Sequence, residues 1–213
     1  LLGGDTVSTP GPLMISITAF GRLPQGTMVH RAGAQAGDRV FVTGTIGDAA
    51  LGLDVLQGGP VAAALADDAA GRDFLAARYR VPQPRNALAR AVRAHASAAM
   101  DVSDGLAGDL AKLCAASGVT AVINVPSVPL SSAAAGLLAR KAIGIETLIA
   151  GGDDYELLCA VPSDRADAFL REARQAKVTV TAIGGLIAGS SPPSFLDGQG
   201  RELKLQRLSY SHF

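Results

Sequence analysis

Two carboxylates and a hydroxyl stand at the start of a strong helical pattern in the middle of the chain. Asp101, Ser103 and Asp104 come just before residues 106–117, in which apolar side chains recur at helical spacing until Gly118 stops the pattern. Ser103 or Asp104 can accept hydrogen bonds from the free amides of the first turn, which is ordinary capping. Two sheltered carboxylates about 5 Å apart repel by roughly 3 kcal/mol at a dielectric constant of 20, so the pair can also hold Mg²⁺. This segment alone leaves both interpretations open.

A second group of acids lies in the segment Gly151–Glu156, directly before an apolar run. In an extended chain Asp154 and Glu156 face one side, whereas Asp153 and Tyr155 face the other. A polar loop before a strand explains one or two acids. Three acids that lead into an apolar strand are typical of a site built from strand ends.

The glycine-rich segment Thr43–Asp48 joins a predicted strand to a predicted helix. Such a turn can cradle phosphate, but this sequence has neither the Walker pattern of Lys next to Ser or Thr nor the full Gly-x-Gly-x-x-Gly pattern. We therefore interpret the segment as a tight turn capped by Asp48.

Period-two and helical patterns outline the elements that position these residues. Strands are expected at residues 12–21, 39–43, 120–125, 157–161 and 178–183. Helices are expected from residue 48 onwards and over residues 61–79, 86–98, 131–141 and 164–175. Gly71 is expected to break the second helix, Ser131 and Ser163 to cap the last two, and Gly184 and Gly185 to form a loop.

The composition shows no preference for a charged partner. Among 213 residues, 19 are Lys or Arg and 19 are Asp or Glu, so no net field favours nucleic acid or an anionic membrane. No apolar run reaches the length of a membrane span. Cys114 and Cys159 lie in apolar segments, which favours two reduced core thiols and a cytoplasmic location. Small molecules are the expected partners.

The first residues do not resemble a native start. Leu1 and Leu2, followed by two glycines, read as the end of a buried strand that turns into a loop. The strand expected at residues 12–21 needs sheet partners, and only one other strand is expected before residue 45. We therefore expect the chain to be a fragment whose further strands lie upstream.

Three spaced motifs together carry a family resemblance. They are Gly3-Gly4-Asp5-Thr6, Asp101-Val102-Ser103-Asp104-Gly105-Leu106 and Gly151-Gly152-Asp153-Asp154-Tyr155-Glu156-Leu157. In this order they resemble the thiamine-monophosphate kinases, within the larger aminoimidazole-ribonucleotide-synthetase-like group of ATP-using enzymes. The resemblance spans the whole chain, including Arg31-Ala32-Gly33-Ala34 and the tail Tyr210…His212-Phe213. It implies Mg²⁺-dependent, direct transfer of the terminal phosphoryl group of ATP to thiamine monophosphate, which gives thiamine diphosphate.

The resemblance also implies roles for particular residues. The expected ATP contacts are Gly4, Arg31 and Ser103. The expected magnesium ligands are Asp5, Asp101 and Asp104, and the expected thiamine-phosphate contacts are Asp153 and Tyr210. No catalytic nucleophile is assigned, because phosphoryl transfer depends on positioning and charge neutralisation. Asp154 and Glu156 are expected only to support their motif.

The predicted fold class is α/β of the α+β type, with a mixed sheet covered by helices. Residues 1–30 are expected to be a remnant of an N-terminal ATP-binding and dimerisation domain, and residues 31–213 to form a C-terminal α/β domain. The family's upstream acids and much of its dimer surface are absent before Leu1. The fragment alone is therefore expected to be inactive, and the full-length protein to be a homodimer. Asp153 stands where Glu is common in the family.

Two rival functions stay open. The first is another ATP-dependent enzyme of the same group, such as a synthetase that activates a carbonyl oxygen by phosphorylation. The second is a non-catalytic fragment that binds a nucleotide or a metal ion. ADP formation with each candidate acceptor separates the kinase from the synthetase. Binding without turnover would indicate the non-catalytic fragment.

Overall fold

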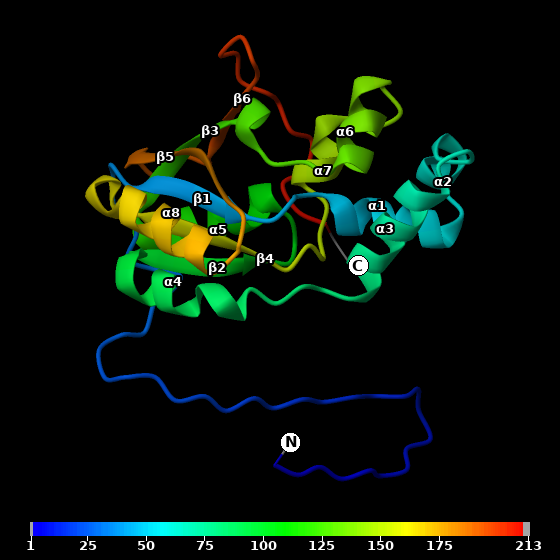
Figure 1. Ribbon diagram of the computed structural model, residues 1–213, viewed down its shortest axis with the longest axis horizontal. Coiled ribbons are helices and arrows are strands. Elements are labelled where there is room, and N and C mark those ends of the chain that lie inside the picture. The colour runs from blue at the N-terminus through cyan, green and yellow to red at the C-terminus, as the bar shows by residue number, and fades with distance from the viewer. Residues whose placement is uncertain (1, 211–213) are drawn as a thin grey trace.

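A six-stranded mixed sheet forms the centre of the protein in the computed structural model, which describes residues 2–210 (Figure 1). The strands are β1 Arg39–Thr43, β2 Ala98–Val102, β3 Val119–Asn124, β4 Glu156–Val161, β5 Val180–Ala188 and β6 Ser194–Leu196. Their order in the sheet is β2-β4-β1-β5-β3-β6, and all neighbouring pairs are antiparallel except β3 and β6. The predicted class is therefore confirmed, although β2 and β6 were not predicted as strands.

Helices cover both faces of this sheet. The α-helices are α1 Asp48–Gln57, α2 Pro60–Ala64, α3 Ala69–Arg80, α4 Ala89–His95, α5 Leu106–Ser117, α6 Ser132–Ala139, α7 Ile145–Ile149 and α8 Ala166–Gln175. Short 3-10 turns are formed by Asn86–Leu88, Val125–Ser127 and Ser163–Arg165. Along β1, Val40 and Val42 join the core under α5, whereas Phe41 joins the core under α4 and α8. A third core between α1, α3 and α6 lies at one end of the sheet (Figure 1).

Some helix ends follow the predicted signals and others do not. Gly118 adopts the left-handed conformation after α5, and the Ser131 hydroxyl caps α6, as predicted. Gly71 does not break a helix, because it lies in the first turn of α3, where Asp68 accepts a hydrogen bond from its amide. Ser163 does not cap α8, because its hydroxyl donates to a backbone carbonyl of the loop before β1.

Residues 2–29 form no helix or strand and extend away from the sheet (Figure 1). The strand predicted at residues 12–21 is therefore wrong for this structure, and its large apolar side chains are 75–89% exposed. A strand is stable when neighbouring strands pair with its backbone, and no strand that the structure describes pairs with this segment. Leu2 is 97% exposed, so the buried strand end expected there is wrong as well; Leu1 lies outside the described residues. The domain boundary after residue 30 stays a prediction.

Gly184 and Gly185 lie inside β5 rather than in the predicted loop. They pair with both β1 and β3, and β5 shifts its register against β1 between Val40 and Phe41. A Cβ atom on Gly184 would lie 2.2 Å from the carbonyl oxygen of Val122, whereas one on Gly185 would meet its nearest atom at 3.6 Å. Glycine at position 184 thus allows two strands to approach closely.

The two cysteines are free and buried, which confirms the predicted core thiols. Burial raises the pKa of Cys114 to about 11 and that of Cys159 to about 12. Both thiols therefore stay protonated and unreactive near neutral pH.

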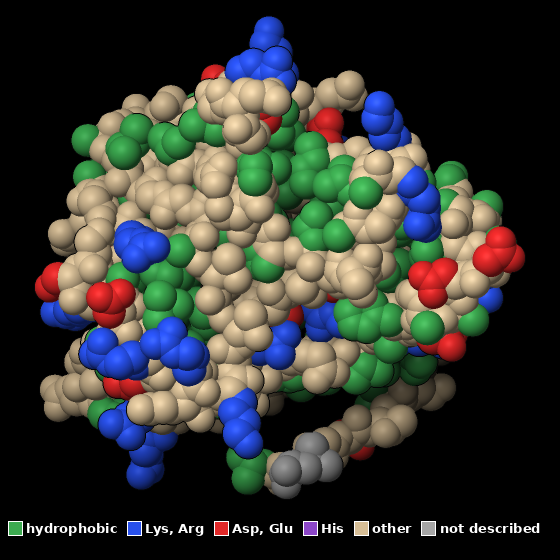
Figure 2. All heavy atoms as spheres, turned by 45° about the horizontal axis from the view of Figure 1, so that its top comes forward, with side chains coloured by type: hydrophobic (Ala, Val, Ile, Leu, Met, Phe, Trp, Pro, Cys, Tyr) green, Lys and Arg blue, Asp and Glu red, His purple; other side chains and the backbone are tan. Residues whose placement is uncertain are grey.

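The surface carries mixed charges. On the face shown in Figure 2, basic and acidic side chains are interspersed with apolar ones, and several basic side chains gather at the lower left of the view. The presence of both signs agrees with the equal numbers of acidic and basic residues in the sequence. Within residues 2–210, no helix is long and apolar enough to cross a membrane.

The two glycines of β5 provide a matched stability test. We expect Gly184→Ala to lower the free energy of unfolding by about 1–3 kcal/mol, because the new methyl group overlaps a backbone oxygen of β3. Gly185→Ala should change it by less than about 1 kcal/mol, because ordinary contact distances are kept. Urea denaturation followed by circular dichroism measures both, and equal losses would contradict the steric explanation.

Candidate functional site

The pairing of β2 with β4 brings the two acidic segments together. Val102 at the end of β2 lies opposite Glu156 at the start of β4, so the residues that follow β2 lie beside those that precede β4. The amide of Asp153 donates to the carbonyl oxygen of Ser103 at 2.7 Å, and the amide of Tyr155 donates to that of Val102 at 2.8 Å. Predicted ATP-contact and thiamine-phosphate residues are therefore neighbours.

The C-terminal tail returns to the same place. The amide of Tyr210 donates to the carbonyl oxygen of Asp104 at 2.9 Å. A Cβ atom on Gly152 would lie 2.6 Å from the carbonyl oxygen of Ser103 and 3.5 Å from the Cβ atom of Tyr210. The absence of a side chain at position 152 therefore lets three segments meet. The fold-back of the tail that the Tyr210 assignment required is confirmed; residues 211–213 lie outside the described part of the chain.

Asp109, rather than the predicted caps, holds the start of α5. The residue before the helix is Gly105, with φ 113°, and no side chain caps it. Instead, the fully buried carboxylate of Asp109 accepts hydrogen bonds from the backbone amides of Ser103 and Asp104, each at 2.9 Å. The capping prediction for Ser103 and Asp104 is therefore wrong, because the helix contributes the acceptor and the loop contributes the donors. The side chains of Ser103 and Asp104 remain partly exposed.

Lys112 links the buried acid to the exposed one. Its ammonium group donates to Asp109 Oδ1 at 2.8 Å and also to Asp104 Oδ2. Burial lowers the pKa of Lys112, but hydrogen bonds and charge from the two carboxylates outweigh burial and raise the pKa above its usual value. Sequence analysis missed both Asp109 and Lys112. Their i,i+3 spacing on a strongly periodic helical segment was the available signal.

Asp153 and Tyr155 have left-handed backbone conformations, with φ 68° and 50°. Such angles are uncommon outside glycine and persist where the surroundings hold them. The Tyr155 side chain is exposed, and its hydroxyl donates to Asp153 Oδ1 at 3.3 Å. Burial, followed by the charges of Asp153, Asp101 and Asp104, raises the pKa of Tyr155. The phenol therefore lies in an acidic environment on the outer side of the loop.

Glu156 faces away from Tyr155, as predicted, and it is fully buried. Its carboxylate accepts hydrogen bonds from the hydroxyl of Thr43 at 2.6 Å, from Arg78 Nη2 at 2.9 Å and from Arg85 Nε at 2.7 Å. Arg85 Nη2 donates to it as well. Glu156 thus fixes the start of β4, and none of these bonds involves the solvent-accessible acids Asp101, Asp104 and Asp153.

Asp154 is also fully buried, and it provides the hydrogen-bond acceptor for the free backbone amides at the start of α1. Its carboxylate accepts hydrogen bonds from the amides of Gly47 at 2.7 Å and Ala49 at 3.2 Å. Asp48, the predicted cap, instead lies inside the first turn and accepts from two hydroxyl groups. Burial raises the pKa of Asp154 to about 7, against the opposing effect of the two amides. The glycine-rich turn is therefore a structural element, as its missing Walker pattern indicated.

The remaining predicted ligand residues lie elsewhere. Gly4 and Asp5 belong to the exposed N-terminal segment, where the Asp5 carboxylate accepts from the amide of its own neighbour. The carbonyl oxygen of Arg31 accepts from Ser117 at the C-terminal end of α5, whereas Ser103 precedes the N-terminal end. Twelve helical residues span about 18 Å. The structure therefore does not bring these three residues to the site.

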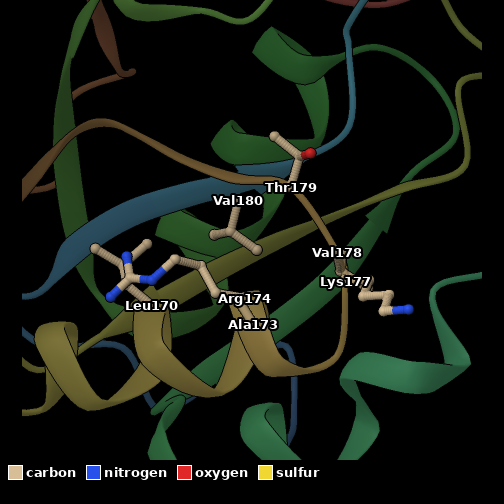
Figure 3. A pocket seen from close by; sticks show the side chains of 7 residues that line it. All are labelled: Leu170, Ala173, Arg174, Lys177, Val178, Thr179 and Val180. Atoms are coloured by element: carbon tan, nitrogen blue, oxygen red, sulfur yellow. The ribbon is translucent and has the colours of Figure 1, made fainter.

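Asp153 and Tyr210 line one pocket with a volume of about 210 Å³. Ala50, Leu51 and Leu53 of α1 give it an apolar wall, and Asp54 and Arg207 line it as well. A hollow of about 420 Å³ between α8 and β5 is lined by Leu170, Ala173, Arg174, Lys177, Val178, Thr179 and Val180 (Figure 3). Its two basic side chains extend in different directions, and it contains no predicted site residue. The smaller pocket is therefore the candidate ligand site.

A protein-family comparison identifies the domain. The model of the family described as AIR synthase related protein, C-terminal domain, matches residues 35–194. This chain belongs to that family. The matched region contains β1 to β5 and every predicted site residue except Gly4, Asp5, Arg31 and Tyr210.

Relatives of this AIR synthase related domain include enzymes. Thiamine-monophosphate kinase of Caulobacter vibrioides is 43% identical over 215 residues, which are the whole of this chain and 58% of that protein. The crystal structure of thiamine-monophosphate kinase from Stenotrophomonas maltophilia K279a has 37% identity and a TM-score of 0.72, covering 81% of this chain and 54% of that one. AaThiL complexed with AMPPCP and TMP has 30% identity and a TM-score of 0.68, covering 87% and 54%. The chain thus spans a little more than half of the proteins that it matches.

The raised pKa of Asp154 predicts a pH-dependent stability for this AIR synthase related domain. The folded state keeps a proton on this carboxyl up to about pH 7, whereas an ordinary Asp with pKa 3.8 loses it earlier. The resulting stabilisation is complete below about pH 4 and is lost as pH rises through 7. Asp154→Asn carries no charge at any pH. We therefore expect its free energy of unfolding, relative to wild type, to rise by on the order of 3–4 kcal/mol between pH 4 and 8.

Urea denaturation at several pH values measures this difference. Asp48 is the other raised carboxyl, and its charge contributes to the raised pKa of Asp154, so the difference between the two proteins reports the coupled titration of this pair. Parallel stability curves for the two proteins would mean that burial does not raise the pKa of Asp154.

Proposed function

We propose that this chain supplies the acceptor site and part of the phosphate site of an ATP- and Mg²⁺-dependent kinase. The enzyme transfers the terminal phosphoryl group of ATP directly to the phosphate of thiamine monophosphate and yields thiamine diphosphate. The observation that carries this proposal is the meeting of Ser103 and Asp104 with Asp153 and Tyr210. It is supported by 43% identity to a thiamine-monophosphate kinase over the whole chain and by a related complex that contains AMPPCP and TMP.

The acceptor half of the site consists of the 210 Å³ pocket. Thiamine carries a cationic thiazolium ring and a flat pyrimidine ring. The Asp153 carboxylate offers opposite charge, and the Tyr210 ring offers a stacking surface. Gly151 and Gly152 let the backbone approach the ligand closely.

The phosphate half of the site consists of Asp101, Ser103 and Asp104. Carboxylate oxygens suit Mg²⁺, which binds one or two protein carboxylates together with water and phosphate oxygens. Asp101 is exposed and the Asp104 side chain is 41% exposed, so both carboxylates are open to a cation whose remaining ligands would be phosphate oxygens and water. Bound Mg²⁺ would neutralise charge on the phosphates. The chain itself would orient Asp104 through Asp109, whose carboxylate fixes the backbone of Ser103 and Asp104.

The roles of Gly4, Asp5 and Arg31 stay proposals that rest on the family resemblance. In this structure these three residues lie apart from Asp101 and Asp104. The homodimer of the whole protein and its cytoplasmic location belong to the proposal as well. Two free buried cysteines agree with a reducing compartment.

The kinase assignment is tested by incubating the purified chain with ATP, Mg²⁺ and thiamine monophosphate. Thiamine diphosphate and ADP are measured by chromatography, with the Caulobacter vibrioides kinase as positive control. We expect the 213-residue chain to form thiamine diphosphate orders of magnitude more slowly, because Asp5 is not held near Asp104. A comparable rate would contradict the proposed role of Asp5. ADP formation with a carboxylate or amide acceptor instead would identify a synthetase, and nucleotide binding without turnover in a full-length version of this protein would identify a non-catalytic protein.

The acceptor pocket is tested by isothermal titration of thiamine monophosphate into variants of the chain. Asp153→Asn removes a charge, and Asn tolerates the left-handed backbone of this position. We expect it to raise the dissociation constant for thiamine monophosphate about tenfold, through loss of one charged contact of about 1.4 kcal/mol. Tyr210→Leu should weaken binding similarly, whereas Tyr210→Phe keeps the ring and serves as the control. AMPPCP binding should change little in all three, and equal losses for both ligands would remove these residues from the acceptor site.

A further inference from the structure

One lysine occupies an oxygen that the proposed function assigns to a metal ion. Lys112 Nζ donates to Asp104 Oδ2 while it also contacts Asp109 Oδ1 at 2.8 Å. The side chains of Lys112 and Asp104 are 40% and 41% exposed, whereas that of Asp109 is 1% exposed. The ammonium group of Lys112 is therefore held by the buried Asp109 and also reaches the accessible Asp104.

The two contacts of Lys112 differ in how easily they exchange. The bond to Asp109 is sheltered, and the same carboxylate is fixed by two backbone amides. The contact with Asp104 is open to solvent, where an ion pair contributes little and competing ions can enter. The flexible four-carbon chain of a lysine lets its ammonium group move while one partner is kept. The arrangement thus has one permanent and one replaceable contact.

We propose that Lys112 is an internal counter-ion that a divalent cation displaces from Asp104, while Asp109 keeps the displaced ammonium group in place. This inference rests on the proposed function only in taking Asp104 as a cation ligand. Lys112 neutralises Asp104 when no metal is bound and competes with the metal for the same oxygen. Its positive charge also repels the incoming cation at short range. Lys112 therefore lowers the affinity for the cation and acts as a positioning residue.

The test uses Mn²⁺ alone as the probe, because it accepts the same oxygen ligands as Mg²⁺ and its free form is measured directly by electron paramagnetic resonance. Wild type is compared with Lys112→Gln, which removes the charge and keeps a donor for Asp109. Lys204→Gln is the matched control, because Lys204 is exposed and the variant has the same net charge. At low ionic strength, we expect Lys112→Gln to bind Mn²⁺ about two- to tenfold more tightly than Lys204→Gln. The gain should shrink at high salt.

Asp104→Asn distinguishes a failure of the proposed metal site from a failure of the counter-ion role of Lys112. If Asp104→Asn binds Mn²⁺ as tightly as wild type, the metal assignment of the proposed function fails, and the role of Lys112 fails with it. If Asp104→Asn weakens binding but Lys112→Gln matches or falls below Lys204→Gln, only the counter-ion inference is overturned. In the Asp104→Asn background, Lys112→Gln should bring no further gain, because the competition for that oxygen is gone.

A second measurement needs no substitution at Lys112. Brief acetylation of the wild-type chain with acetic anhydride is followed by mass spectrometry of the peptides that contain Lys112 and Lys204. Saturating Mg²⁺ should raise the modification of Lys112 relative to Lys204, because the displaced ammonium group has lost one of its two acids. An unchanged ratio would contradict displacement, even if Lys112→Gln did not fold.

Discussion

The buried carboxylate of Glu156 is the contact on which the site geometry depends. It receives hydrogen bonds from Thr43 of β1, Arg78 of α3 and Arg85 of the loop before α4. Gly44 is required directly above it, because a Cβ atom there would lie 2.1 Å from Glu156 Oε1. One residue thus joins the central strand, the helical layer and the start of β4. Removing a single partner of such a buried ion pair typically costs about 3–5 kcal/mol, because the remaining charge is left uncompensated.

The charges around Glu156 do not balance, and this imbalance explains the titration of its neighbours. Asp48, Asp154 and Glu156 are fully buried, and they face the two guanidinium groups of Arg78 and Arg85. Arg78 is itself incompletely satisfied, since its Nη1 atom has no partner within the described part of the chain. Burial raises the pKa of both Asp48 and Asp154, so a proton on one of them offsets the missing positive charge. The network is therefore specific in geometry, and it is most stable below neutral pH.

The sequence predicted the elements whose signals are local. The helix over residues 106–117 followed from periodicity and was confirmed. Asp154 and Glu156 share one side, opposite Tyr155, as predicted, but which side is buried was not predicted. Gly184 was mistaken for a loop residue, because the need for glycine there comes from a strand about sixty residues earlier in the chain. The strand predicted at residues 12–21 failed for a related reason, since a period-two pattern does not supply a pairing partner.

The candidate site shows the same division. Its two acidic motifs, at residues 101–106 and 151–157, were found from residue types, but the partners of the acids were not. Asp109 was missed because it lies inside a helix, where an acid usually faces solvent. Asp154 reaches amides more than a hundred residues earlier in the chain, which no local pattern indicates. The family resemblance supplied the order of the motifs, and the β2–β4 pairing supplied the reason for their meeting.

Burial sorts the acids of this site into two groups with different tasks. Asp109, Asp154 and Glu156 are fully buried, and each accepts hydrogen bonds from fixed protein donors. Their lone pairs are used within the fold, so they set the backbone of the loops and have little capacity left for a ligand. Asp101, Asp104 and Asp153 lie on the same loops and strand ends but keep contact with solvent. A cation or a cationic ring can reach them without first breaking a buried bond, which is the condition for a site that must bind and release its ligands.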